Sequence, residues 1–128
     1  MAYIDDPNII RATIHTQKYN HKVGTFGADN VFDEYHNYTL VWTNNKIEIS
    51  FDDLKYLSYF KDSSSNDSWP FDNGFNIILN LAFGGDWSEA QGVDNTMFPA
   101  RYNIDYVRQY EYVEPTSGES HPRFIWYN

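Results

Sequence analysis

WPFDNGFNIILNLAFGGDW, residues Trp69–Trp87, contains the clearest structural pattern in this chain. From Phe75 to Phe83, five large apolar residues alternate with asparagines and smaller or apolar groups. A period of two with one wholly apolar side predicts a strand that buries one face in a core. Gly84-Gly85 ends this strand, and Trp87 follows on the loop. Amides and an aromatic ring at a strand end could hold a sugar ring, although an ordinary sandwich strand and turn would give the same alternation.

Further strands are expected in the rest of the chain. The Asn44-Asn45 pair predicts a tight hairpin turn, because Asn tolerates positive φ. No long helix and no internal repeat are expected. The predicted strands are Ile10–Gln17, Tyr35–Thr43, Lys46–Phe51, Phe75–Phe83 and Arg101–Tyr112, with a short one possible at Lys55–Phe60.

Several separate motifs resemble those of glycoside hydrolase family sixteen, in the order of its C-terminal half. The segment WPFD, the segment FNIILNLAFGGDW, an FP pair and IDYVRQY are most similar to the laminarinase type, which cleaves β-1,3-glucans and mixed-linkage β-glucans. ATIHTQKYNHKVGT (Ala12–Thr25) is similar to the strand after that family's catalytic motif, and EYHNYTLVWTNNKIEISFDD (Glu34–Asp53) to the next two strands. The resemblance runs from Met1 to about Glu111. It implies an all-β, concanavalin A-like jelly-roll β-sandwich that is incomplete, that is, truncated relative to the family.

The same resemblance implies that the catalytic residues are missing. The family's active site follows the pattern Glu-x-Asp-x-x-Glu, in which the first Glu is the nucleophile and the last is the acid/base. By register, Ala2 stands at the position of the acid/base Glu, and the nucleophile and the Asp would precede residue 1. We therefore expect the chain to be inactive alone, as part of a retaining β-glucan endo-hydrolase.

Other carboxylates are poorly placed to replace this pair. Glu48 and Asp52 share one side of a predicted strand, roughly 13 Å apart at about 3.3 Å per residue. A retaining glycosidase needs its two carboxyl groups about 5–5.5 Å apart. Solvated strand and loop carboxylates are the simpler interpretation.

The resemblance also assigns binding residues. It places His15, Asn80, Trp87 and Arg101 near the substrate, although His15 could equally be a hydrogen-bonding residue on a polar strand face. Asp105 resembles a position at which family members ligate calcium. Calcium takes six to eight oxygens, and the family's other ligands come largely from its N-terminal half, so Asp105 is a weak calcium candidate.

The length of 128 residues fits one domain. We expect a partial sandwich over 1–113 and a tail over 114–128. This tail starts as a linker and ends in the apolar run Phe124–Tyr127, which either covers a sheet face or is flexible. Uncovered sheet edges would favour a homodimer, a strand swap or a thinner sandwich.

Composition limits the possible partners. A net charge of −9 and a pI of about 4.6 argue against nucleic acid and anionic membranes. There is no cysteine, no apolar run of membrane-spanning length and no signal-peptide pattern. These properties suit a neutral polysaccharide, and the resemblance implies an extracellular location. Three functions stay open: part of a β-glucan hydrolase, a non-catalytic, lectin-like β-glucan-binding module, or a structural remnant without a ligand.

Overall fold

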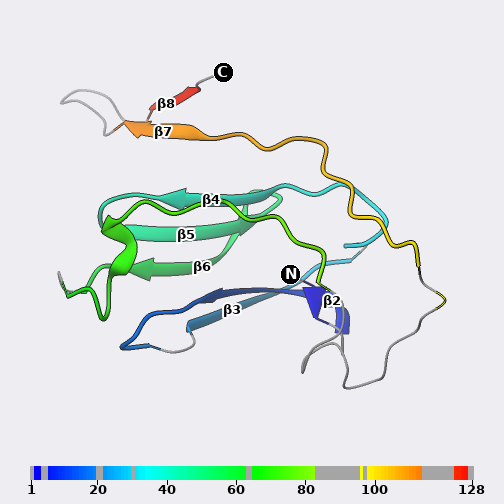
Figure 1. Ribbon diagram of the computed structural model, residues 1–128, viewed down its shortest axis with the longest axis horizontal. Helices are drawn as coiled ribbons and strands as arrows, with labels where there is room; N and C mark the ends of the chain where they lie inside the picture. Colours follow the sequence, from blue (N-terminus) through cyan, green and yellow to red (C-terminus); the bar gives the residue numbers. More distant parts are fainter. Residues whose placement is uncertain are drawn as a thin grey trace.

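The protein consists of antiparallel strands in three small sheets (Figure 1). The computed structural model describes residues 2–3, 6–19, 22–29, 31–62, 65–82, 96, 98–113 and 123–126. A 3-10 turn, η1 (Pro70–Asp72), follows the strands of the second sheet. The strands confirm the expected all-β class.

The first sheet has the order β1-β2-β3, with β1 at Ala2–Tyr3, β2 at Asp6–Ile14 and β3 at Lys22–Gly27. Alternate residues of β2 are buried, namely Ile10, Ala12 and Ile14. The predicted strand Ile10–Gln17 was wrong at its end, because the chain turns after Ile14. In that turn the Thr16 amide donates to the Tyr19 carbonyl at 3.0 Å, and the returning chain becomes β3, which the sequence did not separate from β2.

The second sheet has the order β4-β5-β6, with β4 at Tyr38–Trp42, β5 at Lys46–Phe51 and β6 at Leu54–Phe60. The predicted Asn44-Asn45 turn is confirmed. The Thr43 amide donates to the Lys46 carbonyl at 2.9 Å, which closes the hairpin. The next turn uses Asp52 and Asp53, both in the left-handed region with φ of 45° and 68°.

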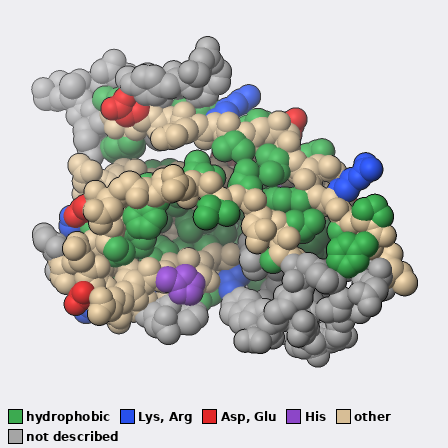
Figure 2. Space-filling view, viewed as in Figure 1, with side chains coloured by type: hydrophobic (Ala, Val, Ile, Leu, Met, Phe, Trp, Pro, Cys, Tyr) green, Lys and Arg blue, Asp and Glu red, His purple; other side chains and the backbone are tan. Residues whose placement is uncertain are grey.

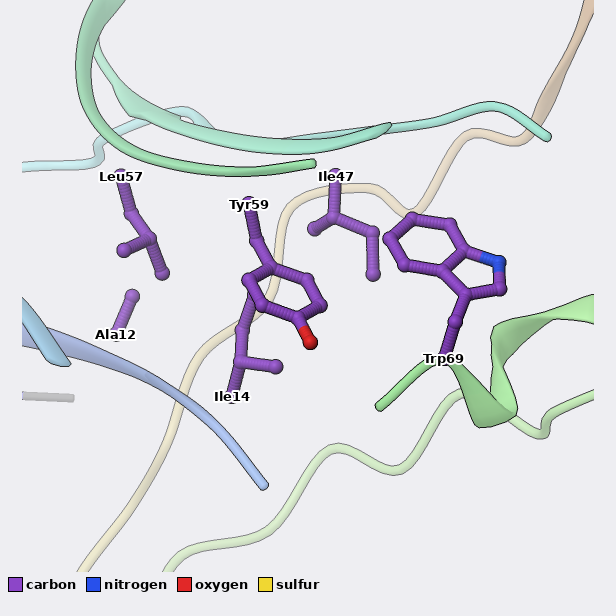
Figure 3. Packing of buried hydrophobic residues seen from close by; sticks show 6 residues of the cluster. All are labelled: Ala12, Ile14, Ile47, Leu57, Tyr59 and Trp69. Carbon is purple, nitrogen blue, oxygen red and sulfur yellow. The ribbon is translucent and has the colours of Figure 1, made fainter. Parts of the chain in front are cut away.

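A small core lies between these two sheets (Figure 3). Trp69 is fully buried and stacks on Tyr59 with the ring centroids 5.6 Å apart. The Trp69 indole Nε1 donates to Asp72 Oδ1 at 3.0 Å, so η1 is tied to the core. The core residues are Ala12, Ile14, Ile47, Leu57, Tyr59 and Trp69.

The two sheets come into close contact where β3 meets β6. A Cβ added to Gly24 would lie 2.8 Å from the Tyr56 carbonyl oxygen and 2.9 Å from Leu57 Cβ. Both distances are well below the ordinary carbon contact of about 3.5–4.0 Å. Glycine therefore allows this crossing.

The strand predicted at Phe75–Phe83 was wrong for its described part. Residues 75–82 belong to no strand and pair with no described strand, and all of them are exposed, with Ile78 at 82%. The strand predicted at Arg101–Tyr112 was also wrong over most of its length, since pairing begins only at β7 (Tyr110–Val113). Alternation supplies an apolar face, but a strand also needs a neighbour for its backbone groups.

The third sheet pairs β7 with β8 (Arg123–Trp126), from Tyr110 opposite Trp126 to Val113 opposite Arg123. Part of the predicted tail is therefore a strand. In Figure 1, β7 and β8 lie apart from β4 at the edge of the molecule.

Candidate functional site

Glu48, one of the two carboxylates considered above as a replacement for the catalytic pair, forms ion pairs with two lysines. It accepts hydrogen bonds from Lys46 at 2.8 Å and from Lys55 at 2.7 Å. These contacts, that of Lys46 first, hold the pKa of Glu48 below its ordinary value of 4.5. A general acid needs a raised pKa, so Glu48 is in the wrong electrostatic environment.

Asp52 is engaged in the same way, in the turn between β5 and β6. Its carboxylate accepts from the Asn37 backbone amide at 2.8 Å and contacts His36 Nδ1 at 2.7 Å. The Asn37 hydrogen bond and then the His36 contact lower the pKa of Asp52. The His36 ring also packs on Phe51, with centroids 4.6 Å apart. These contacts fix the turn and support the structural interpretation of both carboxylates.

The residues predicted to bind sugar come from separate parts of the chain. His15 directly follows β2, Asn80 lies in segment 75–82, and Arg101 lies in segment 98–109, both segments being outside the strands. All three are exposed and accessible to a ligand. Trp87 lies outside the described residues. Ala2 lies in β1, opposite Ile10.

Asp105, the calcium candidate, is exposed in segment 98–109. Within the part of the chain that the structure describes, no group of three or more His, Asp or Glu side chains could hold a metal ion. Asp105 is thus not part of such a group, and calcium binding stays a prediction.

Sequence reasoning missed a hollow of about 570 Å³ at the end of β4. Trp42 forms one wall, and its indole Nε1 donates to the Phe71 carbonyl at 3.1 Å. Asp72, at the rim, already accepts from Lys61 at 2.7 Å and from Trp69. The segments VWTNN and WPFD contained the signal, because each places an aromatic residue beside a turn. The lining residues are Trp42, Thr43, Asn44, Phe71, Asp72, Asn73, Gly74 and Tyr112.

Comparison with known proteins decides the family. The model of glycosyl hydrolases family 16 matches residues 5–108. The chain belongs to this family. A β-glucanase of Rhodothermus marinus is 35% identical over 119 residues, which is 85% of this chain and 42% of that protein.

Solved structures of family 16 members agree with this assignment. The laminarinase from Rhodothermus marinus matches with a TM-score of 0.69 and 29% identity, over 76% of this chain and 43% of that one. A non-specific endo-β-1,3(4)-glucanase, SCLam, co-crystallised with 1,3-β-D-cellotriosyl-glucose, matches with a TM-score of 0.70 and 36% identity, over 77% of this chain and 40% of that one. The expected incomplete jelly-roll sandwich is confirmed, and the chain spans less than half the length of these family 16 relatives.

In the described residues of this family 16 chain, no helix is long and apolar enough to cross a membrane.

Proposed function

We propose that this chain forms a glucan-contacting part of a β-1,3(4)-glucan endo-hydrolase and does not hydrolyse glucan by itself. Membership of family 16 carries the proposal, together with the names of its relatives, which are a β-glucanase and a β-1,3(4)-glucanase co-crystallised with a glucan oligosaccharide. An extracellular location, where such polysaccharides occur, belongs to the same proposal.

The environment of Glu48 and Asp52 supports the proposed lack of activity. Retaining hydrolysis needs one carboxyl group kept protonated as an acid and a second one close to it as the nucleophile. Glu48 and Asp52 both have lowered pKa values and are held by lysines or by the Asn37 and His36 contacts. By register with the family motif, Ala2 stands where the acid/base Glu is expected. Glu48 and Asp52 thus fit neither role.

The exposed side chains of Asn80 and Arg101 support the proposed contact with glucan. Asn80 and Arg101 present exposed amide and guanidinium groups outside the strands, and such groups hydrogen-bond sugar hydroxyls. Trp87 is included on the strength of the sequence alone, because indole rings bury large area and stack on apolar sugar faces.

The test combines hydrolysis with binding. The purified chain is incubated with laminarin while new reducing ends are followed, with the Rhodothermus marinus laminarinase as positive control. In parallel, β-1,3-glucan oligosaccharides are titrated into the chain, into an Asn80→Ala, Trp87→Ala double variant, and into Asn66→Ala. Asn66 is an exposed loop asparagine outside the proposed contacts.

We expect no hydrolysis and saturable binding. The double variant should bind at least about threefold to tenfold more weakly, the equivalent of one lost hydrogen bond, and Asn66→Ala should bind like the parent chain. Hydrolysis that the double variant abolishes would mean that the chain has its own catalytic carboxylates. Absence of binding at millimolar oligosaccharide would instead remove the glucan-contacting role and leave a structural part of the family fold.

A further inference from the structure

The hollow at the end of β4 is bounded by three separate parts of the chain. The turn after β4 and the end of that strand supply Trp42 and Asn44, the stretch around η1 supplies Phe71 and Asn73, and β7 supplies Tyr112. Figure 2 shows the surface hollowed at the upper left of the view, between the part that contains β7 and the strands beneath it. The volume of about 570 Å³ lies within the range of roughly 300–1,000 Å³ that is typical of small-molecule sites.

The aromatic wall of the hollow is held in place by its neighbours. The Trp42 indole Nε1 donates to the Phe71 carbonyl at 3.1 Å, and Phe75 packs edge-to-face on the Trp42 ring with the centroids 5.7 Å apart. Phe71 in turn packs edge-to-face on the buried Trp69 at 5.3 Å. Trp42 is still 37% exposed, so part of its ring is available for stacking. A ring held in this way loses little side-chain entropy when a ligand stacks on it.

The rim of the hollow is polar. Asn44 and Asn73 are exposed there. The Asn73 amide nitrogen donates to the Pro70 carbonyl at 3.0 Å, and the same amide has an oxygen that can accept a hydrogen bond. Asp72 accepts from Lys61 Nζ at 2.7 Å, so a lysine balances its charge. The rim therefore combines side-chain amides with a charge-compensated carboxylate.

This combination favours a neutral saccharide as the ligand. A pyranose ring has an apolar face, which stacks on an indole ring, and hydroxyl groups around its edge, which exchange hydrogen bonds with amides and carboxylates. An anionic ligand is disfavoured by Asp72 and by the net charge of −9. A purely apolar ligand would displace water from Asn44 and Asn73 without replacing its hydrogen bonds.

We propose that the hollow is a second sugar-binding site, which holds a neutral β-glucan chain against the Trp42 ring. The choice of β-glucan among neutral saccharides rests on the proposed function. The hollow is lined by none of the described residues predicted to contact substrate, namely His15, Asn80 and Arg101. A glucan bound here therefore contacts a different set of side chains. Such a site holds the polymer at one point and raises the effective concentration of the neighbouring stretch of the same polymer at the other site.

Gly74 gives a way to block the hollow. It lines the hollow, and a Cβ added there would meet nothing within 4 Å, so Gly74→Leu should occupy part of the space that the sugar needs. Gly27→Leu is the matched control, because a Cβ at Gly27 would likewise meet nothing within 4 Å and Gly27 ends β3, outside the hollow. Asn44→Ala is a milder variant that removes one rim amide from an exposed turn position.

The test follows NMR signals of the full chain during titration with a β-1,3-glucan oligosaccharide. The Trp42 indole N–H and the side-chain amides of Asn44 and Asn73 report on the hollow, and the side-chain amide of Asn80 reports on the first site. We expect saturable shifts of the signals from the hollow, and these shifts should persist in the Asn80→Ala, Trp87→Ala double variant.

The single variants should separate the hollow from the rest of the surface. Gly74→Leu should weaken binding in the hollow at least about tenfold, because the added side chain and the sugar compete for the same space. Asn44→Ala should weaken it about threefold to tenfold, the equivalent of one lost hydrogen bond. Gly27→Leu should bind like the parent chain.

Several results would overturn the proposal. Saturable shifts at Asn80 without shifts in the hollow would remove the second site and leave the proposed function standing. Loss of the shifts in the hollow in the double variant would make the hollow part of the first site. Equal weakening by Gly74→Leu and Gly27→Leu would place the sugar elsewhere. An equal response to an α-1,4-linked glucose oligosaccharide would show that the hollow does not select β-glucan. Absence of shifts at every reporter at millimolar oligosaccharide would overturn this proposal and the proposed glucan contact together.

Discussion

Gly24→Ala tests the packing of the two sheets most directly. The new methyl group would lie 2.8 Å from the Tyr56 carbonyl oxygen and 2.9 Å from Leu57 Cβ. Neither atom is the end of a flexible side chain, so β3 and β6 would have to separate by roughly 0.6–1 Å to restore ordinary contact. Overpacking of this kind costs about 1–3 kcal/mol. Replacing Gly by Ala also lowers the conformational entropy of the unfolded chain, which offsets about 0.4–1 kcal/mol of this loss in stability.

The net expectation is a loss of about 1–2 kcal/mol in the free energy of unfolding. It is measured as a lower urea midpoint, followed through the fluorescence of the buried Trp69. Gly27→Ala is the control on the same strand, since a Cβ there would meet nothing within 4 Å. Gly27→Ala should leave the midpoint unchanged or raise it. Equal midpoints for the two variants would refute the close approach of the sheets at Gly24.

Three further predictions concern single residues. Trp69→Ala should lower the free energy of unfolding by about 3–5 kcal/mol, seen as loss of the cooperative urea transition, because Trp69 is fully buried; a small shift would contradict its place in the core. The pKa of Glu48 lies below its ordinary value of 4.5, so the ion pairs of Glu48 stabilise the folded state above about pH 4.5. This stabilisation is lost as the pH falls through the lowered pKa of the folded state. Glu48→Gln should therefore reduce the loss of urea midpoint on acidification below pH 4.5, and an unchanged pH profile would show that Glu48 is not linked to folding. Asp53→Gly should raise stability by up to about 1 kcal/mol, because φ is 68°, whereas Asp52→Gly should lower it through loss of the Asn37 and His36 contacts; the opposite order of denaturant midpoints would contradict this account of the turn.

The local parts of the fold could be predicted from the sequence. Lys46–Phe51 is β5 with both ends correct, and Asn44-Asn45 is the turn before it, because alternation and turn residues act over a few positions. Residues 75–82 have an equally clear alternation but form no ladder among the described residues. Alternation says which side is apolar, whereas pairing depends on a neighbouring strand that the segment itself does not encode.

The candidate site divides in the same way. The spacing of Glu48 and Asp52 predicts that they are not a catalytic pair, which stays a prediction, and the structure shows the ion pairs that these carboxylates make with Lys46, Lys55 and His36. Asn80 and Arg101 are exposed in the structure, and their role in glucan binding stays a prediction. The hollow beside Trp42 was not predicted: VWTNN and WPFD each place an aromatic residue beside a turn, but the hollow also needs Tyr112, which comes from a distant part of the chain.

The ladders between described strands have a consequence for the order of folding. Each joins strands that follow one another in the sequence, from β1 with β2 to β7 with β8. Such local pairing requires only short loops to close, which favours fast formation. During synthesis, residues 6–72 leave the ribosome before segments 75–82 and 98–109. The first two sheets, with Trp69 packed in the core between them, can therefore assemble first. Segments 75–82 and 98–109 then emerge beside sheets whose strands are already paired, so we expect these two segments to pack after the sheets have formed.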